Sequence, residues 1–84
     1  MADYEAIFGV KELREKPYEG GKPRYDLIYK LTRTVFDASN EGDARFKANE
    51  RKDRLEYCDT NATLLSLSDK IGLPDPKWPI LETN

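Results

Sequence analysis

Histidine is absent from this chain of 84 residues, and only one cysteine is present. Without histidine, the sequence lacks the usual general base, the Ser-His and Cys-His nucleophile pairs, and the commonest metal ligand. A single cysteine builds neither an internal disulfide nor a structural zinc site or iron–sulfur cluster. These absences argue against an autonomous enzyme, and they predict no catalytic residue, no cofactor and no bound metal.

Apolar residues are also scarce, at 38% of the chain against 36% charged residues. A chain this short buries only about 60–65% of the surface that it exposes when unfolded. We therefore predict a single small domain over residues 1–84, with a thin core that a partner protein completes. No run of about 20 apolar residues is present to span a membrane. The acidic residues 1–5 do not resemble a signal peptide, so we expect a cytoplasmic protein.

Charges of both signs alternate instead of forming a basic excess. The net charge is −2, whereas a dedicated nucleic-acid binder is usually basic. The most charged stretch, RFKANERKDRLEY at residues 45–57, mixes five cations with three acids. Because acids beside the cations compete with phosphate groups, this pattern disfavours nucleic acid as a partner. A solvated helix face and a polar surface for another protein remain as interpretations of this stretch.

Residues 26–38, DLIYKLTRTVFDA, form the clearest element of the pattern. The charged residues recur at spacings of 4, 3 and 4, at Asp26, Lys30, Arg33 and Asp37. That spacing predicts one polar stripe along a helix. The threonines, the valine and the aromatics favour a strand. A strand, however, would place Asp26 and Lys30 on the same face as Ile28 and Phe36, so that this face could not be buried without burying charges. We therefore favour a helix.

Two further helices are expected after the turn at residues 40–42. The first has a thin apolar line, and its members are Ala44, Ala48, Leu55 and Cys58. On this line Cys58 is expected to be a half-buried structural thiol. The other helix starts near Asp59 or Thr60, repeats leucines at Leu64 and Leu67, and ends at Gly72.

The two ends of the chain are expected to lack such helices. Residues 17–23, PYEGGKP, predict a turn, and residues 4–13 before it are either a short helix or an extended arm. After Gly72 the tail has three prolines around Trp78, which predicts extended or polyproline-like structure. The expected fold is therefore all-α, a small bundle of about three helices in residues 25–72. An N-terminal arm and loop (residues 1–24) and a C-terminal tail (residues 73–84) flank it.

One family resemblance involves the charged stretch. Tyr25 with the segment after it, then ARFKANE, LEY and Thr60, resemble the small alpha subunit of protocatechuate 4,5-dioxygenase-type extradiol dioxygenases. The similar part spans residues 25–73. Asn49 stands where the family tends to have aspartate, and no Gly-Gly-Asn follows the last segment. The resemblance implies an all-helical accessory subunit that covers a larger subunit's non-haem iron site, with all metal ligands supplied by that partner.

These observations predict a non-catalytic accessory subunit or protein-interaction module that docks on a larger protein. The residues expected to face the partner are Arg45, Phe46, Arg51, Tyr57 and Trp78. Trp78 has a second interpretation, in which its ring closes the domain's own core. The alternative function is a small regulatory or inhibitory protein, for example phage-encoded, that acts on an enzyme or a nucleic-acid complex.

Overall fold

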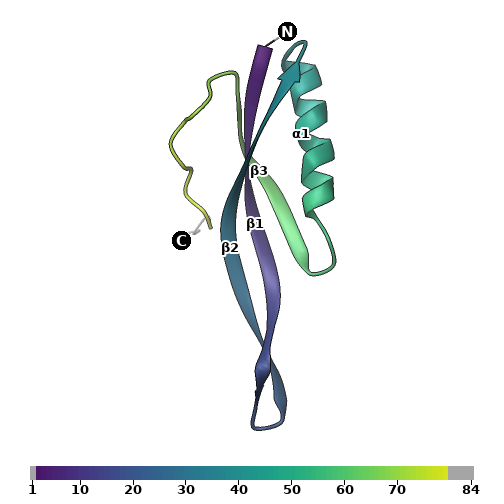
Figure 1. Ribbon diagram of the computed structural model, residues 1–84, viewed down its shortest axis with the longest axis vertical. Helices are drawn as coiled ribbons and strands as arrows, with labels where there is room; N and C mark the ends of the chain where they lie inside the picture. Colours follow the sequence, from purple (N-terminus) through teal and green to yellow (C-terminus); the bar gives the residue numbers. More distant parts are fainter. Residues whose placement is uncertain (1, 80–84) are drawn as a thin grey trace, which may run out of the picture.

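The chain folds as a three-stranded antiparallel sheet with one helix, in the order β1, β2, α1, β3 (Figure 1). The computed structural model describes residues 2–79, without the side chains of residues 17–19 and 23. β1 (Ala2–Glu19) lies in the middle of the sheet, between β2 (Lys22–Ala38) and β3 (Thr60–Ser68). The expected all-α bundle is therefore wrong, because the fold is α+β with a predominance of strand.

The hairpin between β1 and β2 is closed by a two-residue turn. Glu19 pairs with Lys22, and the turn residues Gly20 and Gly21 have φ angles of 70° and 79°. Positive φ at both positions is the requirement of a type I′ turn, which glycine meets without steric cost. The turn expected within residues 17–23 is thus confirmed at its centre, while both strands extend further toward it than the prolines suggested.

Residues 26–38 form strand β2 and not the expected helix. The face that carries Asp26, Ile28 and Lys30 also carries Phe36, as a strand requires. Burial on that face is confined to its far end, where Phe36 lies under α1 with only 7% of its surface exposed. The charged residues lie beyond the helix, so they stay in solvent and do not spoil a buried face.

β3 replaces the expected third helix, and a β-bulge explains the misleading spacing of its leucines. Leu64 pairs with Phe8 of β1, and Leu67 pairs with Ala6, with a register shift between them. The extra residue in the bulge lets two leucines three positions apart face the same side of the sheet. The two leucines therefore have a spacing of three in a strand, although this spacing normally indicates a helix.

The helix α1 (Glu41–Leu55) confirms the helix expected in this region, although it ends before Cys58. Its N-cap is Asn40, whose side chain accepts a hydrogen bond from the Asp43 amide at 2.8 Å, while Asp43 accepts one from the Ser39 amide at 3.0 Å. Such a cap contributes about 1 kcal/mol to helix stability. Ser39 is also the largest reason why the pKa of the Asp43 carboxyl is lowered.

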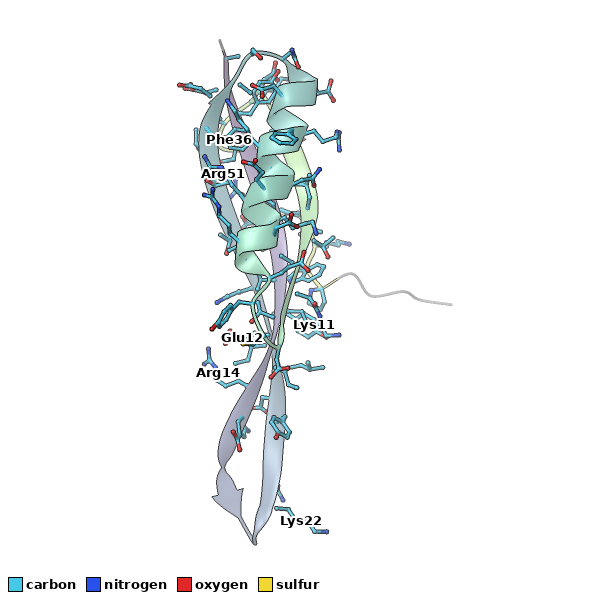
Figure 2. The ribbon with its side chains drawn as sticks, turned by 90° about the vertical axis from the view of Figure 1, so that its right-hand side faces the viewer. Lys11, Glu12, Arg14, Lys22, Phe36 and Arg51 are labelled. Atoms are coloured by element: carbon cyan, nitrogen blue, oxygen red, sulfur yellow. The ribbon has the colours of Figure 1, made fainter. Side chains whose placement is uncertain are left out.

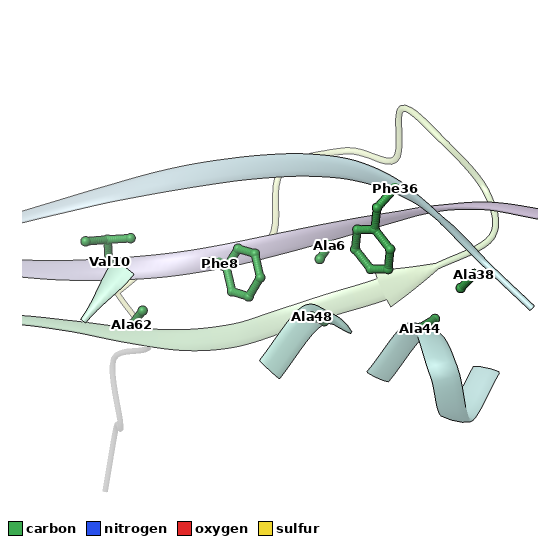
Figure 3. Packing of buried hydrophobic residues seen from close by; sticks show 8 residues of the cluster. All are labelled: Ala6, Phe8, Val10, Phe36, Ala38, Ala44, Ala48 and Ala62. Carbon is green, nitrogen blue, oxygen red and sulfur yellow. The ribbon is translucent and has the colours of Figure 1, made fainter. Parts of the chain in front are cut away.

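The core lies between α1 and one face of the sheet (Figure 3). Its large buried residues are Phe8, Val10 and Phe36, and the helix contributes only Ala44 and Ala48. Alanine keeps the helix close to the sheet but buries little apolar area. The thin alanine line expected from the sequence is therefore confirmed, whereas Cys58 is exposed and not half-buried as expected.

The opposite face of the sheet is covered by residues 69–79, which have no helix or strand (Figure 1). Trp78 lies against Gly9, and its indole N–H donates a hydrogen bond to the Val10 carbonyl at 3.1 Å. Its ring also meets Tyr29 edge-on, with centroids 6.0 Å apart. Residues 73–79 form no helix, as expected for the tail, whereas residues 80–84 lie outside the described part.

Candidate protein-interaction surface

The β1–β2 hairpin extends well beyond β3 and α1 (Figure 1). Pairing between β1 and β3 ends at Glu12 and Thr60, and the Leu13 amide makes one last hydrogen bond to the Asp59 carbonyl. Residues 13–28 therefore form a two-stranded projection, called the arm below. Two-stranded ribbons are marginally stable in water by themselves. Packing against another protein would therefore stabilise an arm of this kind.

One face of the arm is apolar and exposed. We call it the arm face; its residues are Leu13, Tyr25 and Leu27 of the arm, together with Tyr29, which continues the same face of β2 just beyond the arm. Leu13 and Leu27 are direct cross-strand neighbours, and the two tyrosines follow the same side of β2. Tyr25 is 55% exposed and Leu27 is 52% exposed. The arm face therefore gathers large apolar side chains that nothing in the described chain covers fully.

A pocket of about 320 Å³ borders the arm face where the arm meets the end of β3. Leu13 and Leu27 form its apolar wall, while Lys11, Asp59 and Asn61 supply polar groups. The exposed thiol of Cys58 also lines it. A pocket beside an exposed apolar stripe is the arrangement in which anchor residues of a partner are usually held.

The other face of the arm is charged and internally paired. Lys16 contacts Asp26 across the strands at 2.8 Å, and Lys30 approaches Glu12 at 3.6 Å. Glu12 and Arg14 lie near the base of the arm and Lys22 near its tip (Figure 2). The arm is thus amphipathic across its thickness, with ion pairs on one face and apolar side chains on the other.

The hairpin also differs in charge from the rest of the chain. Residues 11–30 carry six cations and four acids, whereas the remaining residues carry eight cations and twelve acids. The hairpin is therefore net positive, at +2, on a chain whose remaining part is net negative, at −4. A partner surface that is both apolar and acidic would be complementary to it.

The five residues predicted to face a partner do not form one surface. Arg45 and the 63%-exposed Phe46 lie on the outer side of α1, and Tyr57 is exposed just after the helix. Arg51 is half-buried, with its guanidinium 5.0 Å from the centre of the Phe36 ring (Figure 2). Trp78 lies on the opposite face of the sheet, in the position of the alternative interpretation, where it closes the domain's own packing.

The arm face was not among the surfaces predicted from the sequence. A signal was available, because Tyr25, Leu27, Tyr29 and Leu31 alternate with polar residues, as one face of a strand does. The helical spacing of the charged residues between them outweighed that signal. The pairing of β1 with β2, which places Leu13 beside Leu27, could not be read from either segment alone.

One acidic pair, at the end of the sheet away from the arm, makes the stability of the fold depend on pH. Asp3 and Asp37 are cross-strand partners, and their shared hydrogen bond, followed by repulsion between their charges, raises the pKa of Asp3. A raised pKa means that the folded state holds the proton more tightly than the unfolded state does. The pair therefore favours folding at acidic pH, and this contribution is lost as the pH rises through the raised pKa.

We accordingly expect Asp37→Asn to be more thermally stable than the wild type at neutral pH, because the substitution removes the repulsion. The gain should shrink at about pH 3, where Asp3 is largely protonated in both proteins. Thermal unfolding followed by circular dichroism at both pH values measures the difference. A gain of equal size at both pH values would contradict this account of the pair.

No family model, curated protein or solved structure matched this chain. Within residues 2–79, no group of three or more acidic, cysteine or histidine side chains is arranged to hold a metal ion. In the same range, no helix has both the length and the apolar character needed to cross a membrane. Of the segments that resemble the dioxygenase subunit, ARFKANE lies in α1, but those at Tyr25 and Thr60 lie in β2 and β3, so the all-helical architecture that the resemblance implies is not the architecture of this chain.

Proposed function

We propose that this chain is a non-catalytic protein-interaction module that docks on a larger protein through the arm face. The observation that carries the proposal is the exposure of Leu13, Tyr25, Leu27 and Tyr29 on one side of a projecting hairpin. Aromatic and large aliphatic side chains are the usual anchors of protein interfaces. The proposal does not depend on the resemblance to dioxygenase subunits.

The partner that fits the arm face is a protein surface with an apolar groove and acidic margins. The groove would receive the side chains of the arm face, and the acids would meet the excess of cations in residues 11–30. Nucleic acid fits less well, because Lys16 and Lys30 already contact Asp26 and Glu12 across the strands. Each internal ion pair reduces the gain from binding a phosphate group.

The docking face can be located by site-specific photo-cross-linking in living cells. A photoreactive phenylalanine analogue at Tyr25 should give an adduct with a partner protein, which mass spectrometry identifies. The same analogue at Phe46, an exposed aromatic on α1, is the matched control and should give none. An adduct from Phe46 and none from Tyr25 would move the docking surface to the helix and contradict the proposal.

The purified partner then allows a quantitative test with a matched pair of substitutions. Leu27→Glu should weaken binding at least about tenfold, because it places a charge in the apolar contact. Ile71→Glu changes a residue of almost equal exposure, 51% against 52%, outside the arm and should leave the affinity unchanged. Equal affinities of the two variants, measured by isothermal titration calorimetry, would contradict the assignment of the arm face as the docking surface.

A further inference from the structure

β2 is an edge strand along its whole length. The sheet order is β2-β1-β3, so the outer side of β2 has no strand partner within the described chain. An edge of 17 residues presents a row of backbone N–H and C=O groups that can pair with another strand. Proteins usually protect such edges with charged side chains or cover them. The pattern of charges on β2 therefore decides what can pair with it.

The residues around Ile28 are complementary to themselves in the antiparallel direction. Antiparallel pairing about a two-fold axis at Ile28 places Asp26 opposite the second copy's Lys30, and this pair occurs twice. On the other face, Leu27 lies opposite the second copy's Tyr29, and Tyr25 opposite its Leu31. We propose that two copies of this chain pair through the edges of β2 in this register and form a dimer with one continuous sheet.

Neighbouring registers lack this complementarity. An axis at Leu27 would place Arg24 opposite the second copy's Lys30, which brings like charges together. An axis at Tyr29 would place Asp26 opposite a threonine and Lys30 opposite an isoleucine, so neither charge gains a partner. An axis at Lys30 would place two copies of that lysine against each other. The charges thus select the register centred on Ile28.

The charges in this register extend ion pairs that already exist within each chain. Asp26 contacts Lys16 at 2.8 Å, and Lys30 lies 3.6 Å from Glu12. The dimer would join these pairs into one alternating network on the charged face of the arms. Exposed ion pairs contribute little affinity, so the network fixes the register, while backbone hydrogen bonds and the apolar neighbours stabilise the contact.

The charged end of β2 limits the length of the pairing. Arg24 would lie opposite the second copy's Thr32, which lines a pocket together with Arg51 and Arg54. Repulsion among these arginines opposes pairing beyond residues 25–31. Within that range residues 25–27 of each arm lie beside residues 29–31 of the other copy, just beyond that copy's arm, so each marginal two-stranded ribbon gains a third strand on its open edge. The two α1 helices remain at opposite ends of the dimer and do not collide.

The dimer goes beyond the proposed function and uses a different part of the arm. Pairing occurs at the edge of β2 and leaves the arm face open, so the arm faces of both copies become adjacent parts of one larger apolar surface. Asp26 and Lys30, which fix the register, point away from the arm face. Substitutions at these two residues therefore test the dimer without altering the apolar side chains of the arm face.

Charge reversal with mixing is the decisive experiment. The wild type should sediment as a dimer at high micromolar concentration, whereas Asp26→Lys alone and Lys30→Asp alone should be monomers, because each places like charges opposite each other. An equal mixture of the two variants should regain the dimer as a heterodimer, identified by native mass spectrometry. Loss of the intramolecular pairs cannot be rescued by mixing, so the rescue is specific to contact between copies.

A cysteine cross-link tests the axis itself and needs no change of charge. In a Cys58→Ser background, Ile28→Cys should form a disulfide-linked dimer on mild oxidation, because the two copies' residues 28 face each other at bonding distance. Thr32→Cys is the control, since its copies would lie roughly 25 Å apart. A wild type that stays monomeric, mixed variants that fail to dimerise, or equal cross-linking at both positions would each overturn the dimer. Cross-linking of a different protein at Tyr25 would persist if only the dimer proposal fails.

Discussion

Replacing Trp78 with alanine should lower the free energy of unfolding by about 3 kcal/mol, the lower end of the range for truncating large aromatics, because Trp78 is only half-buried. The reason is that the ring packs on Gly9 of β1 and donates a hydrogen bond to the Val10 carbonyl, so its loss releases the tail from the sheet. Chemical denaturation followed by circular dichroism measures the change.

Gly9 supplies the partner variant for this prediction. A Cβ atom at Gly9 would lie 2.4–2.6 Å from three atoms of the indole ring, closer than side chains tolerate. Gly9→Ala should therefore displace Trp78, cost about as much as Trp78→Ala, and shift the tryptophan fluorescence to longer wavelength. Adding Gly9→Ala to the Trp78→Ala protein should have little further effect, because the clash is gone. Additive losses in the double variant would show that the two residues do not act through this contact.

Replacing Arg33 with methionine should lower the free energy of unfolding, as measured by chemical denaturation, because it removes the counter-ion of Glu5. The Glu5 carboxylate is buried, with 6% of the residue exposed, and it accepts hydrogen bonds from the Arg33 guanidinium at 2.8 Å and from the Gly72 amide at 3.1 Å. Removing the guanidinium leaves a buried charge without its counter-ion, which is strongly destabilising. The expected loss lies below the full range for buried pairs, because 30% of the Arg33 side chain is exposed.

The control for this prediction removes the carboxylate charge as well. Glu5→Gln added to Arg33→Met should recover part of the lost stability, because an amide does not need a counter-ion. Arg33 also donates hydrogen bonds to Asp75 and to the Leu73 carbonyl, and the hydrogen bond with Asp75 is the largest reason why its pKa is raised. These tail contacts stay broken in both variants, so recovery should be incomplete. If the double variant is as unstable as Arg33→Met or less stable, the buried charge is not the cause of the loss.

Several elements were predictable because the signals that define them are local. The turn within residues 17–23 depends on consecutive glycines that accept positive φ, and this requirement is visible in the sequence. The helix at residues 41–55 has its cap at Asn40 and its two alanines on one side, which are also local features. The absence of a helix from residues 73–79 follows from their three prolines.

The strands were mispredicted where long-range pairing overrides local spacing. In β2, Asp26 and Lys30 have the spacing of a helical stripe, but each finds a charged partner on β1 across the hairpin. In β3, Leu64 and Leu67 share a face only because a bulge shifts their register against β1. Neither the partner strand nor the bulge can be read from the segment itself. The spacing of charged and apolar residues alone therefore predicted helices where the chain forms strands.

The sequence by itself determined that this chain has no histidine, one cysteine and too little apolar material for a thick core, since composition does not depend on the path of the backbone. It also determined that the chain turns within residues 17–23 and that a helix follows residue 40, because those features depend on neighbouring residues. Only the tertiary structure decided that β1 lies at the centre, that Trp78 packs on the chain's own sheet, and that an apolar face is left open on the arm. Those outcomes depend on which strands pair and in which register, and pairing joins residues far apart in the sequence.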